Sequence, residues 1–206
     1  MTVDILDAGS GNIKSIQNWI ERLYIPTTII KKPTEIKSKF LVVPGVGSVG
    51  PYMDKLKKKS FDKAIQDHIN NGGRLLGICL GFQIMGAYSE EDGGVEGLGL
   101  VLGHTAKLGN NVSHNGWEKF FINKDKLNTQ SFNSTMRLTK RKNIKGRVFY
   151  NHEYGFISKD KKIFNQSISS NLNSYSSMII KENIIGIQFH PEKSQQTGLD
   201  LMSMIL

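Results

Sequence analysis

The first half of the chain alternates short apolar runs with segments of helical periodicity. Apolar residues recur at helical spacing from Asn12 to Leu23, from Phe61 to Asn71 and from Leu80 to Tyr88. Between them lie apolar runs typical of buried strands: Val3 to Ala8, Thr27 to Ile30, Phe40 to Val43 and Arg74 to Ile78. This alternation predicts βαβ units, and therefore an α/β fold with an open, mostly parallel (mixed) central sheet and helices on both faces.

After Gly93-Gly94 the pattern changes to short strand-like pieces between Asn- and Lys-rich turns. We expect these pieces to form antiparallel additions: His104 to Leu108, Trp117 to Ile122 and Val148 to Asn151. Ser176 to Ile180 and Ile184 to Phe189 predict a hairpin, and the second strand is buried because nearly all its residues are apolar. A helical pattern from Thr197 to Leu206 closes the chain.

Length and composition restrict the class of protein. The 206 residues suit one domain, so we expect residues 1–206 to form a single domain. The net charge is +9, but 22% charged and 38% hydrophobic residues are ordinary globular values and exclude wholesale disorder. The basic clusters lack interleaved aromatic residues, so no nucleic-acid partner is expected. Without a leader pattern or an 18-residue apolar window, we expect a cytoplasmic protein with no membrane association.

The single cysteine, Cys79, excludes an internal disulfide and a zinc site built from several thiolates. It lies in the G-x-C-x-G of residues 77–81, between a predicted strand and a predicted helix, as in a nucleophile elbow with sulfur replacing hydroxyl. The glycines permit the tight turn, and a helix N-terminus favours thiolate. We therefore predict Cys79 as a nucleophile and the N–H of Leu80 as an oxyanion donor. The alternative is a buried structural cysteine.

Two further motifs follow predicted strands and should open at the same sheet edge. His190 follows an apolar strand, and Glu192 can hold its imidazole, which predicts a base oriented by a carboxylate. The loop Pro44-Gly45-Val46-Gly47 follows another strand, and its glycines leave N–H groups accessible for a second oxyanion donor. The alternatives are a structural histidine at a strand end and an ordinary turn.

Together these motifs resemble the class I, triad-type glutamine amidotransferases. They are G-I-C-L-G-F-Q at 77–83, P-G-V-G at 44–47 and H-P-E-K-S at 190–194. Within that family, the segments around residues 7–13, 116–117 and 190–198 are similar to the glutaminase subunits of imidazole glycerol phosphate synthase. The resemblance extends from near the N-terminus to the C-terminus.

The resemblance implies hydrolysis of L-glutamine to glutamate and ammonia through a glutamyl thioester, with no metal or other cofactor. It implies that Cys79 attacks the carboxamide, His190 protonates the departing ammonia and activates water, and Glu192 orients His190. It places Gly47 and Leu80 in the oxyanion hole. It also implies a set of substrate-binding residues: Gln83, His152, Glu153 and Tyr154.

The resemblance further implies a heterodimer in which ammonia passes to a separate (β/α)8-barrel cyclase subunit, giving imidazole glycerol phosphate and an aminoimidazole carboxamide ribotide in histidine biosynthesis. Asn12, Trp117 and Lys193 match residues at that interface; the residues alone also allow a helix cap, a core tryptophan and a solvated lysine. One rival function is a paralogous glutaminase serving sugar amidination for surface polysaccharide, and another is a catalytically silent binding module. The chain departs from the usual family pattern at Ala8, Asn115, Glu118, Asn151 and Glu153.

Overall fold

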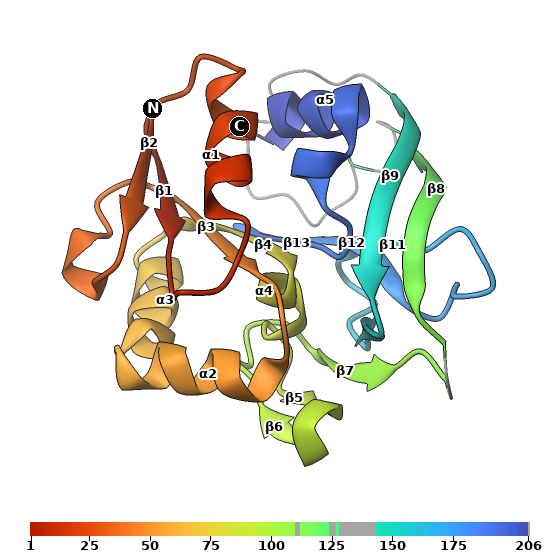
Figure 1. Ribbon diagram of the computed structural model, residues 1–206, viewed down its shortest axis with the longest axis horizontal. Helices are drawn as coiled ribbons and strands as arrows, with labels where there is room; N and C mark the ends of the chain where they lie inside the picture. Colours follow the sequence, from red (N-terminus) through yellow and green to blue (C-terminus); the bar gives the residue numbers. More distant parts are fainter. Residues whose placement is uncertain (110–111, 124–126, 128–142, 206) are drawn as a thin grey trace.

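A computed structural model describes residues 1–109, 112–123, 127 and 143–205. Its main sheet has seven strands in the order β11-β12-β13-β4-β3-β1-β2 (Figure 1). These strands are β1 (Val3–Leu6), β2 (Thr27–Ile30), β3 (Phe40–Gly45), β4 (Arg74–Cys79), β11 (Phe164–Ser167), β12 (Ser176–Lys181) and β13 (Ile184–Ile187). Strands β2, β1, β3, β4 and β13 are parallel, whereas β12 and β11 are added antiparallel. The predicted mixed, mostly parallel sheet is confirmed.

Helices cover both faces of this sheet (Figure 1). The α-helices are α1 (Ile13–Glu21), α2 (Val49–Lys58), α3 (Phe61–Asn70), α4 (Leu80–Gln83) and α5 (Gln195–Ile205). Helices α1 and α5 share a buried cluster with Ile5 and Leu76, while α2 and α3 share another with Leu6 and Leu75. Successive strand residues therefore point to opposite faces and are buried on both, which explains the continuous apolar runs. No helix within the described ranges has the length and apolar character needed to span a bilayer.

Two smaller sheets stand beside the main one. A four-stranded sheet has the order β10-β7-β5-β6, and β8 pairs antiparallel with β9. Their strands are β5 (Tyr88–Ser89), β6 (Val95–Glu96), β7 (Gly103–Lys107), β8 (His114–Ile122), β9 (Ile144–His152) and β10 (Tyr154–Ser158). The predicted antiparallel character is confirmed for β7 with β10 and for β8 with β9, whereas β5 and β7 run parallel.

Tertiary contacts override the local pattern in the segment after Cys79. The helix predicted from Leu80 to Tyr88 ends at Gln83, and Tyr88 belongs to β5. The helix stops because the carbonyl groups that would continue it accept hydrogen bonds from a distant loop. The N–H of Leu98 binds the Ile84 carbonyl at 2.7 Å, and the N–H groups of residues 99–101 bind the carbonyl groups of Met85 and Gly86. The predicted helix was therefore too long by more than a turn.

Helix α2 and the end of β3 show how proline is accommodated. The Gly50-Pro51 pair in α2 lies in the first turn, where N–H groups have no helical partner and a missing one costs nothing. Strand β3 continues through Pro44 to Gly45 instead of stopping at Val43. The pairing of β3 with β1 ends at Val42, so beyond that point only β4 is alongside and proline is tolerated as at a sheet edge.

Candidate active site

Cys79 occupies a strained turn between β4 and α4. Its backbone has φ +53° and ψ −108°, a region that residues with a side chain rarely adopt. A Cβ atom at Gly81 would overlap the Val43 carbonyl oxygen, and one at Gly77 would overlap the Gly81 carbonyl. The glycines are therefore required by close backbone approach, which holds the cysteine at the tip of the turn. Because α4 has only four residues, it supplies a shorter run of aligned peptide dipoles than the sequence pattern suggested.

We predict that Gly81→Ala lowers the free energy of unfolding by about 3 kcal/mol, since its methyl group has no space against β3. Chemical denaturation monitored by fluorescence measures the change. Gly116→Ala is a matched control, because a Cβ atom there meets nothing within 4 Å. Equal stability of both variants would contradict the steric explanation of the G-x-C-x-G pattern.

His190 follows β13 and is held by both backbone and side chain. Its N–H binds the Phe149 carbonyl at 2.8 Å, and the 3-10 helix η4 (Pro191–Lys193) then turns the chain back. That turn brings Glu192 Oε1 to 2.9 Å from His190 Nδ1, with the Glu192 side chain fully buried. Burial opposes protonation of His190, but hydrogen bonds with Cys79 and Glu192 outweigh it and raise the pKa of the imidazole to about 10. The ring is therefore positively charged at neutral pH.

Residues from distant parts of the chain line one cavity of about 120 Å³ beside the thiol. The residues that line it are Val46, Gly47, Cys79, Leu80, Gln83, Glu91, Asn151, His152, Glu153, Tyr154, His190 and Lys193. They include every predicted catalytic, oxyanion and substrate-binding residue except Glu192, which stands behind His190. The loop carrying Gly47 is anchored by the Ser10 hydroxyl, which donates to the Val46 carbonyl, and by Tyr52, which donates to the Pro44 carbonyl.

The sequence did not identify Gln188 and Glu91, two polar residues of this site. Gln188 is fully buried, and its Nε2 lies 3.8 Å from Cys79 Sγ, while its Oε1 accepts from Gln83 Nε2 at 3.3 Å. Gln188 is a polar residue within an apolar strand-like run, two positions before His190, and this could have indicated that it belongs to the site. Glu91 lines the cavity, and Oε2 accepts the N–H of Val49 at 3.1 Å; burial raises the pKa of its carboxyl. Glu91 lies in the acidic loop Glu90-Glu91-Asp92, which has no periodic pattern from which its place in the cavity could be predicted.

The three predicted interface residues lie at or near the surface. Trp117 is 38% exposed and meets the Phe149 ring edge-on, with 5.7 Å between centroids, so a core role for this tryptophan is wrong. Lys193 Nζ lies 5.6 Å from the centroid of the same Phe149 ring and also lines the cavity. Asn12 precedes α1 and is half-buried; among the described residues its side chain makes no capping hydrogen bond. We call Trp117, Phe149 and Lys193 the aromatic patch.

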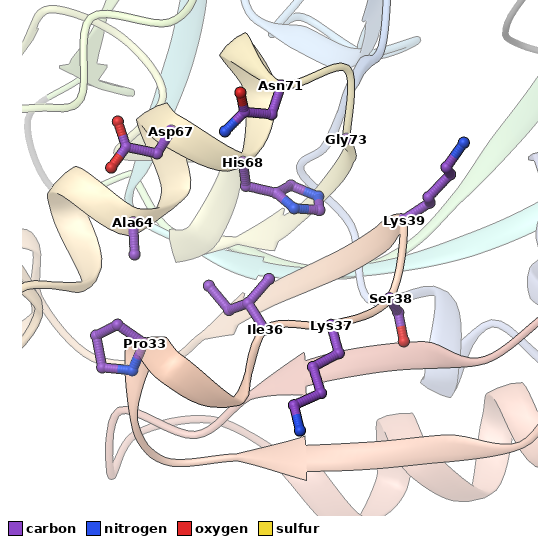
Figure 2. Close-up of a pocket in the computed structure, with 10 residues that line it drawn as sticks. All are labelled: Pro33, Ile36, Lys37, Ser38, Lys39, Ala64, Asp67, His68, Asn71 and Gly73. Carbon is purple, nitrogen blue, oxygen red and sulfur yellow. The ribbon is translucent and has the colours of Figure 1, made fainter.

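A larger pocket of about 410 Å³ lies between α3 and the segment that connects η1 (Pro33–Glu35) to β3 (Figure 2). It stands near the start of β3, whereas ligands of open α/β sheets bind beyond the carboxyl ends of the strands. His68 Nε2 lies 3.1 Å from the Arg74 carbonyl oxygen, which gives this ring a structural partner. Lys37 and Lys39 are exposed, and no predicted site residue lines the pocket.

Comparison with known proteins agrees with this geometry. The family model "glutamine amidotransferase class-I" matches residues 4–203. Imidazole glycerol phosphate synthase subunit HisH of Bacillus subtilis is 32% identical over 210 residues, covering 98% of this chain and 93% of that protein. Imidazole glycerol phosphate synthase hisHF of Arabidopsis thaliana is 34% identical over 212 residues, covering 99% of this chain and 34% of that protein.

A solved structure shares the fold at low sequence identity. The structure of PurLQS from Thermotoga maritima superposes with a TM-score of 0.71 at 16% identity, covering 98% of this chain and 96% of that one. That likeness supports the architecture, while the family match over nearly the whole length supports the chemistry of the group. The chain belongs to the class I glutamine amidotransferases.

Proposed function

We propose that this chain is a glutaminase subunit that hydrolyses L-glutamine with Cys79, His190 and Glu192 and delivers the ammonia to a separate synthase subunit. The observation that carries the proposal is the single cavity that contains Cys79, His190 and both oxyanion candidates. A thiol, a charged imidazole and a buried carboxylate in this order match the requirements of acyl transfer.

In the proposed reaction, the proton of the Cys79 thiol is carried by His190, and the thiolate Sγ bonds to the carboxamide carbon of glutamine. The N–H groups of Gly47 and Leu80 stabilise the negative oxygen of the tetrahedral intermediate. His190 gives its Nε2 proton to the leaving nitrogen, so that the C–N bond breaks and ammonia and a thioester form. His190 then takes a proton from water as the water attacks the thioester, and the C–S bond breaks. Glutamic acid leaves and ionises to glutamate, and the Cys79 thiolate and the charged His190 are restored. Glu192 holds the Nδ1 side of the ring throughout.

The polar wall of the cavity suits the amino-acid end of glutamine. The Glu91 carboxylate provides a negative charge for the α-ammonium group. Residues His152, Glu153 and Tyr154 line the same cavity and place main chain beside the substrate, and Gln83 Nε2 donates to the Tyr154 carbonyl at 2.6 Å. Gln83 is the last residue of α4, the helix that follows Cys79. This hydrogen bond therefore connects the substrate-binding segment to the helix that positions the thiol.

The aromatic patch is the proposed docking surface for the synthase. Lys193 belongs both to the cavity and to the patch, so the patch adjoins the place where ammonia forms. Trp117 presents an exposed aromatic surface, which is common at the energetic centre of protein interfaces. We place Asn12 at the edge of the same surface, since η4 and α1 are neighbours.

For the partner we propose a (β/α)8-barrel cyclase that makes imidazole glycerol phosphate and an aminoimidazole carboxamide ribotide. The name and full-length similarity of the Bacillus subtilis relative support this choice. The second candidate is a cyclase-like partner in sugar amidination. The chain departs from the usual family pattern at Asn151 and Glu153 in the cavity wall and at Glu118, which follows Trp117 in β8, and these departures weaken the choice of the first partner.

Reconstitution decides between these partners. We expect the matching synthase subunit, with its own ligand, to raise glutamine turnover about 10- to 100-fold, because a site that spilled ammonia into water would waste glutamine. Trp117→Ala should remove most of that stimulation, whereas Tyr24→Ala, at a residue that is 97% exposed outside the patch, should not. Stimulation by the sugar-pathway partner alone would select the second candidate. Equal turnover with and without every partner would contradict the subunit assignment.

A further inference from the structure

A line of side chains runs behind the substrate wall, from β8 to the cavity. His152 Nδ1 donates to the Tyr154 carbonyl at 2.7 Å, and its Nε2 lies 3.1 Å from His114 Nδ1. His114 Nε2 in turn lies 3.1 Å from Glu118 Oε1. The antiparallel register of β8 and β9 pairs His114 directly with His152. We call Glu118, His114 and His152 the histidine chain.

The number of protons in the histidine chain is set by its two ends. A carbonyl oxygen at Tyr154 and a carboxylate at Glu118 both accept hydrogen bonds and donate none. Three junctions therefore require three N–H groups, whereas two neutral imidazoles supply two. The histidine chain is complete only when one imidazole carries a second proton.

The second proton belongs on His114. Burial lowers the pKa of His152 to about 3, so this ring is neutral and uses its single proton toward Tyr154. Burial also lowers the pKa of His114 below its usual value, and the Glu118 carboxylate offsets only part of that shift, so His114 holds the second proton at low pH and loses it as pH rises. Within the described residues, His114 Nε2 is buried and its only near acceptor is the Glu118 carboxylate at 3.1 Å, which is not aligned as a hydrogen bond, so the junction with Glu118 is where the second proton is required.

The surroundings keep Glu118 in place as an acceptor. The Ser169 hydroxyl lies 2.8 Å from Glu118 Oε2, and the Tyr150 ring stacks on His114 with 4.3 Å between centroids. The titratable groups that face His114 are thus Glu118 on β8 and Tyr150 and His152 on β9, with the charged His190 beyond His152. None of these neighbours other than Glu118 offers His114 a negative charge at neutral pH.

We propose that Glu118 is a positioning residue that, through His114, makes the hold of His152 on the Tyr154 carbonyl, and with it the affinity for glutamine, depend on pH. This inference rests on the proposed function, because it takes glutamine as the ligand of the cavity. The Tyr154 carbonyl also accepts a hydrogen bond from Gln83 Nε2 of α4. The histidine chain and the helix after Cys79 therefore hold the same carbonyl group of the cavity lining.

The sign of the pH effect follows from the proton count. At low pH the His114 imidazolium donates to both His152 and Glu118, and the wall is held. As pH rises and His114 loses its second proton, a nitrogen lone pair faces either a carboxylate or another lone pair, and the affinity falls. In Glu118→Gln the amide N–H donates to the neutral His114 ring, so the histidine chain is complete without the extra proton.

Calorimetric titration of L-glutamine into Cys79→Ala protein tests this, because that background prevents turnover. We expect Glu118→Gln to bind about fivefold more tightly than the Glu118 parent at pH 8.5, with the ratio approaching one at pH 5. Glu96→Gln, which removes an exposed carboxylate from β6, should follow the parent at every pH. Parallel pH profiles for Glu118→Gln and its parent would overturn the proposal.

A measurement without substrate separates this inference from the proposed function. Nitrogen NMR of the histidine rings should show His114 holding its second proton to higher pH in the parent than in Glu118→Gln, with His152 protonated at Nδ1 in both. Identical His114 titrations would overturn the histidine chain. Absence of glutamine binding in every protein, with the expected ring titrations, would refute the glutaminase proposal and the link from the histidine chain to glutamine affinity.

Discussion

Cys79→Ala should abolish glutamine hydrolysis, with turnover falling by a factor on the order of 10⁴ or more, because no other described side chain in the cavity can form the thioester. Coupled detection of glutamate measures the loss. A glutamine-analogue electrophile should label the parent protein and leave the variant unmodified. Because the alanine side chain fits where the thiol stood, thermal unfolding of the variant should stay close to that of the parent.

Ammonium salts provide the decisive control for this prediction. With the matching synthase, Cys79→Ala should still support product formation from added ammonium, since only the source of ammonia has been removed. Failure of ammonium to restore synthesis would show that Cys79 serves a purpose beyond hydrolysis. Residual glutamine-dependent synthesis at the parent rate would contradict the role of the thiol altogether.

Glu192→Gln should reduce glutamine turnover about 10³-fold while keeping the side chain's shape. The carboxylate accepts from His190 Nδ1 at 2.9 Å, which leaves Nε2 free to face the substrate and stabilises the charged ring. An amide stabilises imidazolium poorly and can present N–H to the ring, which favours the wrong tautomer. Steady-state kinetics should show the loss mainly in kcat. In the comparison variant Glu153→Gln, kcat should fall far less, because the hydrogen bond to His190 Nδ1 comes from Glu192. Equal losses in the two variants would contradict the orienting role.

Glu192→Gln should also change how the free energy of unfolding depends on pH. Burial opposes the charge on His190, but hydrogen bonds with Cys79 and Glu192 raise its pKa from 6.5 to about 10. A raised pKa contributes stability that is fully present below pH 6.5 and is lost as pH rises toward 10. The stability advantage of the parent over Glu192→Gln should therefore be largest near pH 6 and shrink by pH 10. Urea denaturation at both pH values measures it, and an advantage that grew with pH would contradict this assignment.

Local pattern was sufficient where neighbouring residues set the geometry. The apolar runs predicted the parallel strands because these strands are buried on both faces. The G-x-C-x-G predicted a tight turn at Cys79, and the two-residue spacing of His190 and Glu192 predicted their contact. For the turn and for the His190–Glu192 contact, the relevant partners lie within a few residues of one another; for the strands, hydropathy along each segment was enough.

Local pattern failed where partners come from distant segments. The helix after Cys79 is cut short by amides from residues 98–101, which no window around the helix contains. The residues alone left Trp117 open between a core position and a surface position, and only the pairing of β8 with β9 turns it outward against Phe149. Glu91 reaches the cavity because η2 (Glu91–Gly93) folds back onto the start of α2.

By itself, the sequence determined the five parallel strands, the strained turn at the thiol and the pairing of imidazole with carboxylate, since these depend on side-chain size, hydropathy and short spacing; it did not reveal α2, β10 or β11. Only the tertiary structure decided the walls around the thiol, the outward face of Trp117 and the approach of Glu118 to His114 and His152. Those contacts depend on strand register and on long-range packing, which bring together residues that are far apart along the chain.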